Sequence, residues 1–533
     1  MRSPVAIVFV SASIILLLLP RLALLTNGLD AQRIWDTNTP DAFRFLAAVK
    51  TEKVGEFFLT DHKYPLLGSY LYLPVIGGYY LVNKSAGIFS SPADFIQAYA
   101  LGETSLFFCL RLEALLLNLA AIALLIGIVR REFKEVRWAP LIMLVFLAAD
   151  FTLAMFSVQP RIHSWAFAGT VLTWYLALRL LRKKSWFNYL MALGAAGLTI
   201  SLAQSGVTTL ALPVAAHFLG TEGGGRRRLF SGLGLAGLIA LFIGYPHLLG
   251  NLAGAANPLL SGEHQRPGFG LAELWQFLRD FFVYQEMAAG LAVIAGVWAG
   301  WRARWRLRPL EVMASAHLLF WLLLFGFADV TTPRFALVIL PSLLLLVVSF
   351  LIRLESKRFV WYGVCFLLLV QLYGVMQLAR LAGAGDTREQ AAVWLLSESQ
   401  PDDMIVTTLD PDFLGIVPTG AAIALSGGPR GASEQLIFEK QLRGEKSRFI
   451  QYQPEGIEIA PGIDWIATSK PLSGEMFSTF SLVHTVTGNA RGGEDYVAWD
   501  TVPAGRRPVA LRLQRFRAFG PGIYIYRNNE IVK

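Results

Sequence analysis

The sequence predicts a polytopic α-helical membrane protein that carries a C-terminal extracytoplasmic α/β domain. Of its 533 residues, 54% are hydrophobic and only 16% are charged, whereas soluble domains carry about 25% charged residues. The apolar residues come in blocks of roughly 18 to 25, the length that crosses a bilayer as a helix. After residue 382 the composition changes to short strand and helix patterns. We therefore expect a membrane-embedded part, 1–382, followed by a soluble part, 383–533.

The basic residues are distributed as in a multi-pass membrane protein. The formal net charge is +9, but the lysines and arginines gather in short clusters between the apolar blocks. This is the positive-inside pattern, and it argues against nucleic-acid binding. Cys109 and Cys365 both lie in apolar blocks, which favours neither a disulfide framework nor a metal site. The clusters expected on the cytoplasmic side are 130–137, 179–184, 226–228, 302–308 and 353–358.

These clusters fix a topology of eleven spans with the N-terminus inside and the C-terminus outside. The apolar run that ends near Leu25 is too long for the core of a signal peptide, so we interpret it as an uncleaved first span. The expected spans lie near 5–25, 104–129, 138–157, 164–181, 186–203, 205–221, 229–248, 280–300, 310–329, 335–352 and 359–381.

Residues 65–83 are apolar enough to span, but a span here would move every later basic cluster to the outside. The segment contains Pro65 and Pro74, several glycines that weaken a helix, and five tyrosines within 64–80 that favour the interface. We therefore predict a re-entrant or interfacial element within one long outer loop, 26–103.

The soluble part is expected to mix helices and strands. A helix is expected to begin near Asp386, and a second helix is expected over 433–450. The predicted strands are 404–409, 421–425, 464–468, 480–486, 496–499 and 523–526. The part contains no glycine-rich phosphate loop, HExxH or nucleophile-elbow motif, which favours a lid or acceptor-docking domain over an independent enzyme.

The long first loop is rich in ionisable side chains. Loops of this length are usually functional, and carboxylates at a membrane surface can act as general bases toward an acceptor. Lysine and arginine can hold a phosphate group. A loop whose charges merely face water is the equally weighted alternative. The residues concerned are Asp30, Arg33, Asp36, Asp41, Arg44, Asp61, His62 and Lys63.

Later segments add further candidates on the same side of the membrane. Arg161 and His163 lie in the connection after the span 138–157, and Arg334 lies in the connection before the span 335–352. Asp150, inside a span, is a functional candidate by default, and a paired structural carboxylate is the alternative. Arg111 is expected near the outer end of the second span, paired with Glu103 or Glu113. Carboxylates and cations together suit a substrate whose leaving group is a lipid phosphate.

The order of these segments resembles the GT-C glycosyltransferases, in particular the bacterial branch related to the protein O-mannosyltransferases (glycosyltransferase family 39) and the lipid A aminoarabinose transferase. Residues 41–49 are similar to the family's Asp-Glu-x-x-Tyr-x-x-x-Ala pattern, with Ala42 in place of the second acid. Residues 61–67 are similar to its His-x-Pro-Pro-Leu stretch, with Tyr64 in place of the first proline. The later similarities are 157–163, 332–335 with 340–341, 386–388 with Trp394, and 521–526.

The resemblance implies an inverting hexosyl- or pentosyltransferase with a polyprenyl-phosphate sugar donor and a lipid, glycan or protein acceptor. Asp41 would be the base, with Asp36 or Asp30 in reserve. Lys63, Arg161 and Arg334 would bind phosphate, and His62 and His163 would orient substrate. A divalent metal is left open, because some relatives use one and others do not.

Two other functions stay open at this point. A transporter or flippase of polyprenyl-linked sugars would need internal repeats or helices broken near the midplane of the membrane. A non-catalytic membrane scaffold would make no demand for carboxylates in the first loop.

Overall fold

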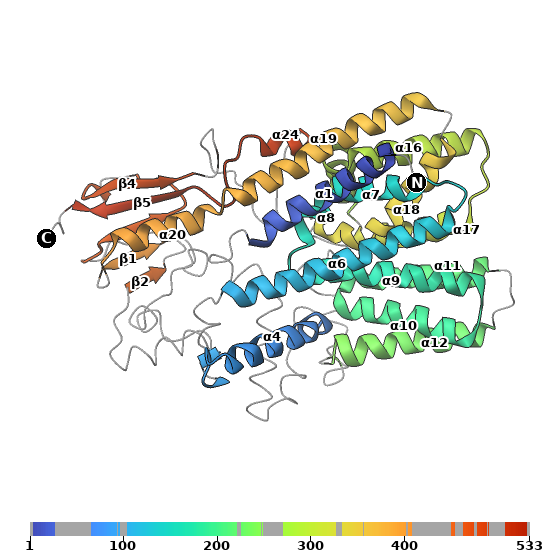
Figure 1. The fold of residues 1–533 in the computed structure, drawn as a ribbon, viewed down its shortest axis with the longest axis horizontal. Helices are drawn as coiled ribbons and strands as arrows, with labels where there is room; N and C mark the ends of the chain where they lie inside the picture. Colours follow the sequence, from blue (N-terminus) through green and yellow to red (C-terminus); the bar gives the residue numbers. More distant parts are fainter. Residues whose placement is uncertain are drawn as a thin grey trace.

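The structure is a computed structural model. It describes residues 4–26, 65–92, 94–95, 104–220, 225–246, 248, 270–326, 333–354, 357–400, 403–407, 449–452, 462–473, 477–487, 489 and 507–529. A bundle of helices forms one part of the molecule, and a small sheet lies beyond one end of the bundle (Figure 1).

The bundle is that of a helical membrane protein with several apolar spans. Among the described helices, four are long and apolar enough to cross a membrane, and a bent pair that turns by 109° between Gln285 and Met287 would make a fifth. The expected count of eleven stays a prediction. The bundle helices are α1 (Pro4–Thr26), α6 (Thr104–Glu132), α7 (Ala139–Ala149), α8 (Phe151–Phe156), α9 (Ile162–Arg182), α10 (Trp186–Leu202), α11 (Ala211–Leu219), α12 (Arg226–Ile239), α15 (Leu271–Arg279), α16 (Met287–Arg302), α17 (Pro309–Phe325), α18 (Leu340–Arg353) and α19 (Arg358–Gly383).

Several expected spans are interrupted in the structure, so they are not single continuous helices. The span 138–157 breaks at Asp150, whose extended backbone separates α7 from α8. The short helical segments η1 (Gln204–Leu210), η2 (Ala240–Gly244), η3 (Asp280–Gln285) and η4 (Pro333–Val338) begin or end other spans. Hydropathy alone does not register such breaks, because the side chains on either side of each break remain apolar.

All five basic clusters meet at one end of the bundle, which we call the basic end. The contacts that join them are the ion pair of Arg182 with Glu132, the hydrogen bond of Arg228 to the Lys184 carbonyl, that of Arg353 to the Arg306 carbonyl, the stacking of Arg308 over the Phe133 ring, and the packing of Trp138 against Trp361. Their convergence is what one cytoplasmic face would require.

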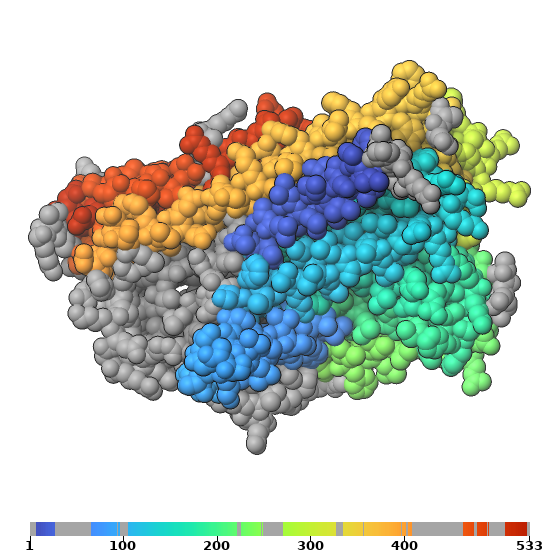
Figure 2. All heavy atoms as spheres, in the orientation of Figure 1, coloured from blue at the N-terminus to red at the C-terminus, as the bar shows by residue number. Residues whose placement is uncertain are grey.

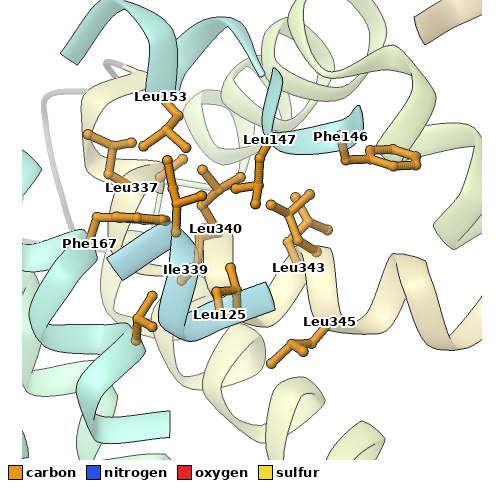
Figure 3. Close-up of a cluster of buried hydrophobic side chains, with 14 of the residues drawn as sticks. Leu125, Phe146, Leu147, Leu153, Phe167, Leu337, Ile339, Leu340, Leu343 and Leu345 are labelled. Carbon is orange, nitrogen blue, oxygen red and sulfur yellow. The ribbon is translucent and has the colours of Figure 1, made fainter. Parts of the chain in front are cut away.

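The core lies around α18, in which every residue from Leu340 to Leu351 is buried. A helix that is apolar all round is expected to be buried. Figure 3 shows leucines and isoleucine of this region meeting Leu125, Leu147, Leu153 and Phe167 from other helices. Along one face of the molecule α1 and α19 lie side by side (Figure 2).

The segment predicted to be re-entrant or interfacial forms one helix, α4 (Leu67–Ser85). The Leu66 N–H donates to the carbonyl of Gly244 at 3.0 Å, so α4 starts where η2 ends. From there it runs toward the end of the bundle that faces the sheet (Figure 1). Helix α4 is not among the helices long and apolar enough to span, and its re-entrant or interfacial character stays a prediction. The rest of the predicted loop 26–103 lies largely outside the described residues.

The C-terminal part contains a five-stranded mixed sheet in the order β2-β1-β3-β5-β4. The β1 strand is parallel to β2 and β3, whereas β5 is antiparallel to β3 and β4. Helix α20 (Thr387–Glu398) packs against the sheet. The strands are β1 (Met404–Thr407), β2 (Phe449–Tyr452), β3 (Trp465–Thr468), β4 (Phe480–Val486) and β5 (Ile523–Asn528).

Four of the six predicted strands are confirmed, and the strands 421–425 and 496–499 lie outside the described residues. The predicted helix 433–450 is wrong at its last two residues. Phe449 and Ile450 belong to β2, because their backbone pairs with Met404 and Ile405 of β1. Of the rest of that predicted helix nothing is described.

The sheet is fastened to the end of α19. The buried Asp386 caps α20, accepting from the backbone N–H of Arg388, and also pairs with the Arg388 guanidinium. Arg380 of α19 donates to the Phe516 carbonyl at 2.6 Å, just after the short helix α24 (Val509–Leu513). Close packing at this junction requires Gly520, whose φ is +91°, because a Cβ there would lie 2.3 Å from Thr387 Oγ1.

We predict that Gly206→Ala destabilises the bundle. An added Cβ would lie 2.3 Å from the Thr199 carbonyl oxygen of α10, and backbone atoms cannot move aside cheaply, so the cost is about 1–3 kcal/mol. Gly234→Ala, on α12 with open space around its Cβ position, should be neutral or stabilising by up to about 1 kcal/mol. Thermal unfolding of the detergent-purified protein measures both, and equal midpoints for the two variants would contradict the packing.

Candidate functional site

The structure describes three of the seven predicted site residues, namely Arg161, His163 and Arg334. Asp36, Asp41, His62 and Lys63 lie outside the described residues, as does Asp30. The site is therefore built from the α8–α9 connection and from η4.

The α8–α9 connection is a buried hairpin. Every residue from 146 to 167 is buried. The Asn118 amide of α6 donates to the Ser157 carbonyl at 3.2 Å, which ties the hairpin to the bundle. The Gln159 side-chain amide donates to the Met155 carbonyl, and the Gln159 backbone carbonyl accepts from the Ser164 hydroxyl. These hydrogen bonds satisfy buried backbone groups, which allows an irregular turn inside an apolar bundle.

Arg161 and His163 begin α9. Arg161 is the residue before the helix, with an extended backbone, and its side chain does not cap α9. Arg161 is 5% exposed and His163 is 6% exposed. Two basic side chains are thus held at low exposure within three residues of one another.

The segment η4 brings a third basic residue to this place. The Phe335 ring packs edge-on against the His163 imidazole, with ring centroids 5.0 Å apart. The Arg334 guanidinium lies 5.4 Å from the centre of the same Phe335 ring. Arg161 and Arg334 both act electrostatically on the His163 imidazole. We call Arg161, His163 and Arg334 the cation cluster.

The cation cluster lies at the end of the bundle opposite the basic end. Helix α9 has 21 residues, which is about 31 Å at 1.5 Å per residue. Its last turn carries Arg179 and Arg182 at the basic end, and its first turn carries His163. The same end of the bundle faces the C-terminal sheet (Figure 1). Two guanidinium groups and an imidazole held together at low exposure suit an anionic group such as a phosphate.

A second buried polar group lies deeper, where two helix breaks meet. Asp150 Oδ1 accepts from the Leu153 N–H at 2.7 Å and so caps α8. Glu286, at the bend before α16, accepts from the Phe151 N–H at 3.2 Å and from the Gln371 amide at 2.7 Å. Arg21 of α1, fully buried, interacts electrostatically with Asp150. We call Arg21, Asp150 and Glu286 the carboxylate cluster.

Sequence reasoning singled out Asp150 but missed Glu286 and Arg21. The available signal was the same for all three, since each is an ionisable residue inside a predicted span. Arg111 donates to the Leu25 carbonyl at the end of α1 at 3.2 Å, and its pairing with Glu103 or Glu113 stays a prediction, since Glu103 lies outside the described residues. It is 1% exposed and joins α6 to α1.

Metal ligands and cavities add little to the cation cluster. Within the described ranges, no three His, Cys, Asp or Glu side chains come together as a metal site, and the predicted option of a divalent metal stays open. A cavity of about 340 Å³ is lined by Trp138, Arg358, Trp361 and Tyr362. It belongs to the basic end and is therefore remote from the cation cluster.

No family model matches the chain, and no curated protein matches it in sequence. Among solved structures, the chain is similar to ArnT from Cupriavidus metallidurans in the apo state, with a TM-score of 0.50 and 13% identity over 87% of this chain and 92% of ArnT. The structure of the same protein bound to undecaprenyl phosphate gives a TM-score of 0.49 and 12% identity over 84% and 90%. The resemblance to the GT-C aminoarabinose transferases is thus confirmed, as a likeness of fold over most of the chain.

We predict that Asn118→Leu loosens the hairpin that carries Arg161. The change removes the donor to the buried Ser157 carbonyl, which should cost about 1–3 kcal/mol. Asn83→Leu is the matched control, because the Asn83 amide donates within its own helix, to the Tyr79 carbonyl, and to no other group in the described part of the chain. Thermal unfolding in detergent compares the two variants, and an equal loss for both would show that the contact with Ser157 contributes nothing.

Proposed function

We propose that this protein is a membrane glycosyltransferase of a bacterial inner membrane. It takes a sugar from a polyprenyl-phosphate donor and passes it to a lipid, glycan or protein acceptor on the outer face. The observation that carries the proposal is the cation cluster, in which Arg161, His163 and Arg334 come together from two distant segments at one end of an ArnT-like fold.

Charge supports the orientation. The five basic clusters share one end of the bundle, and the positive-inside rule assigns such an end to the cytoplasm. The cation cluster and the C-terminal sheet then belong to the outer face. There the cluster meets a lipid-linked donor whose sugar is already outside, and the C-terminal part covers or docks the acceptor.

The chemistry divides between two sets of residues. In the proposed reaction Asp41, or Asp36 or Asp30 in its place, removes a proton from the acceptor, which then attacks the sugar carbon from the side opposite the phosphate. Lys63, Arg161 and Arg334 stabilise the negative charge that develops on the departing polyprenyl phosphate. His62 and His163 orient the substrates.

A transporter or flippase of lipid-linked sugars is the second candidate. One observation favours it, because the breaks at Asp150 and at Glu286 place half-helix ends and carboxylates inside the bundle, as transporters do. Purified protein that forms new sugar–acceptor bonds supports the transferase. Protein that moves the intact lipid-linked sugar across vesicles and makes no product supports the transporter.

We predict that Arg161→Ala lowers kcat/KM for the donor by about 10- to 100-fold, because one charge-assisted contact to phosphate is lost. Arg334→Ala should act similarly. Arg358→Ala, at the basic end, is the matched control and should leave transfer unchanged. The measurement is transfer from purified polyprenyl-phosphate sugars, with thermal unfolding as a check that each variant is folded. Equal activity of the Arg161, Arg334 and Arg358 variants would remove the cation cluster from the site.

We predict that Asp41→Asn abolishes transfer, with a loss of at least about 100-fold, while the protein still folds in detergent. Asp36→Asn should cost less if Asp41 is the base. Asp94→Asn, a carboxylate held by Ser90 and Ser91 at the surface, is the control. Full activity of the Asp41 variant would sink its assignment as the base.

A further inference from the structure

The carboxylate cluster lies where no charge should be left unbalanced. Asp150 follows the 11 residues of α7, about 16 Å from Trp138 at the basic end, which is about halfway through a hydrocarbon layer of about 30 Å. Leu147 and Leu153, on either side of Asp150, belong to the apolar cluster of Figure 3. Asp150 is 1% exposed, Glu286 is 3% exposed and Arg21 is 0% exposed.

We propose that Asp150, Glu286 and Arg21 form a buried proton-binding site, which holds one proton on the carboxyl pair in the folded protein. The proposal is independent of the proposed transferase function. It rests on the charges that face one another and on the hydrogen bonds that each oxygen makes.

The charges do not balance without a proton. Among the described residues, Asp150 interacts electrostatically with Arg21 and with Glu286, so the cluster contains two carboxylates and one guanidinium. Helix α19 contributes the neutral Gln371, and η3 contributes the neutral Gln285, which bonds Thr152. The α18 and η4 segments contribute apolar side chains, among them Leu337, Leu340 and Leu343. Fully ionised, the cluster would carry one uncompensated negative charge in an apolar bundle, which is strongly unfavourable.

The hydrogen bonds of the two carboxyls differ. Both oxygens of Glu286 accept, from the Phe151 N–H and the Gln371 amide. The Gln371 amide is held in the donating orientation, because its own oxygen accepts from the Ala288 N–H at 2.9 Å. Asp150 Oδ1 accepts from Leu153, whereas Oδ2 has no hydrogen-bond partner in the described part of the chain. An ionised buried oxygen without a donor is the costlier choice. The missing donor at Oδ2 favours a proton on Asp150, whereas Arg21 acts on Asp150 and favours its ionised form, so the two carboxyls share one proton.

The protonation state of Asp150 affects the hairpin that carries the cation cluster. Asp150 caps α8, and α8 leads directly into the turn before Arg161 and His163. Release of the proton to water places a full charge at the start of α8, so the pH of the medium acts on the segment that positions these two residues.

The first test is the pH dependence of stability, measured by unfolding of the full-length protein in detergent between about pH 6 and pH 9. In the unfolded chain both carboxyls are ionised at these pH values, so the folded state binds one more proton. Stability is then lost as pH rises, by up to about 10-fold in the folding constant per pH unit. Asp150→Asn mimics the protonated acid and should remove this loss.

Asp94→Asn is the matched control and should keep the wild-type pH dependence. Hydrogen bonds from Ser90, and then from Ser91, lower the pKa of Asp94, which lies outside the bundle, so this group stays ionised throughout the range. If the Asp150→Asn variant loses as much stability with rising pH as the wild type does, the proposal is overturned.

Infrared spectroscopy of the folded protein at neutral pH gives a second readout that does not depend on unfolding. The wild type should show a carboxylic-acid carbonyl band that Asp150→Asn removes. Glu286→Gln should remove it too, since Arg21 alone then balances an ionised Asp150, whereas Asp94→Asn should retain it. A band that neither cluster variant removes overturns the proposal. The proposal is also overturned if sodium chloride restores the stability of the protein at high pH and choline chloride does not. In that case the site would hold a sodium ion.

Discussion

The pairing of the broken backbone at Asp150 is the interaction on which the other features of the bundle depend. A helix interrupted inside an apolar bundle exposes N–H groups that no water can reach. Here Asp150 accepts from Leu153 and Glu286 accepts from Phe151, so two carboxylates from different helices cap α8 together. After the break the chain continues into the buried hairpin, which places Arg161 and His163 next to η4.

The two ends of the bundle differ in how they treat positive charge. At the basic end, arginines pair with Glu132, stack on aromatic rings or bond to carbonyls, and their number suits a cytoplasmic face. At the opposite end Arg161, His163 and Arg334 are held close together at the start of α9 and in η4. Guanidinium groups bind phosphate oxygens through charge-assisted hydrogen bonds, which is why we propose this cluster as the place of the donor phosphate.

The C-terminal part is anchored where the proposed chemistry occurs. Arg380 and the Asp386–Arg388 pair hold the sheet to the last turn of α19 and the start of α20. The sheet therefore stays beyond the end of the bundle that carries the cation cluster (Figure 1). A domain held in this place suits a cover or docking surface for an acceptor.

The sequence by itself determined the class of protein, the basic clusters that converge on one end, most of the described strands, and the resemblance of fold to the aminoarabinose transferases. Each follows from a local property such as apolar block length, charge position or alternation. Only the tertiary structure decided that Arg334 meets His163, and that Glu286 and Arg21 join Asp150. Those contacts link segments far apart in the chain, and periodicity reports that a residue is buried without reporting its partner. The break at Asp150 also escaped prediction, since an apolar run reads the same whether its helix is continuous or capped midway by a carboxylate from another helix.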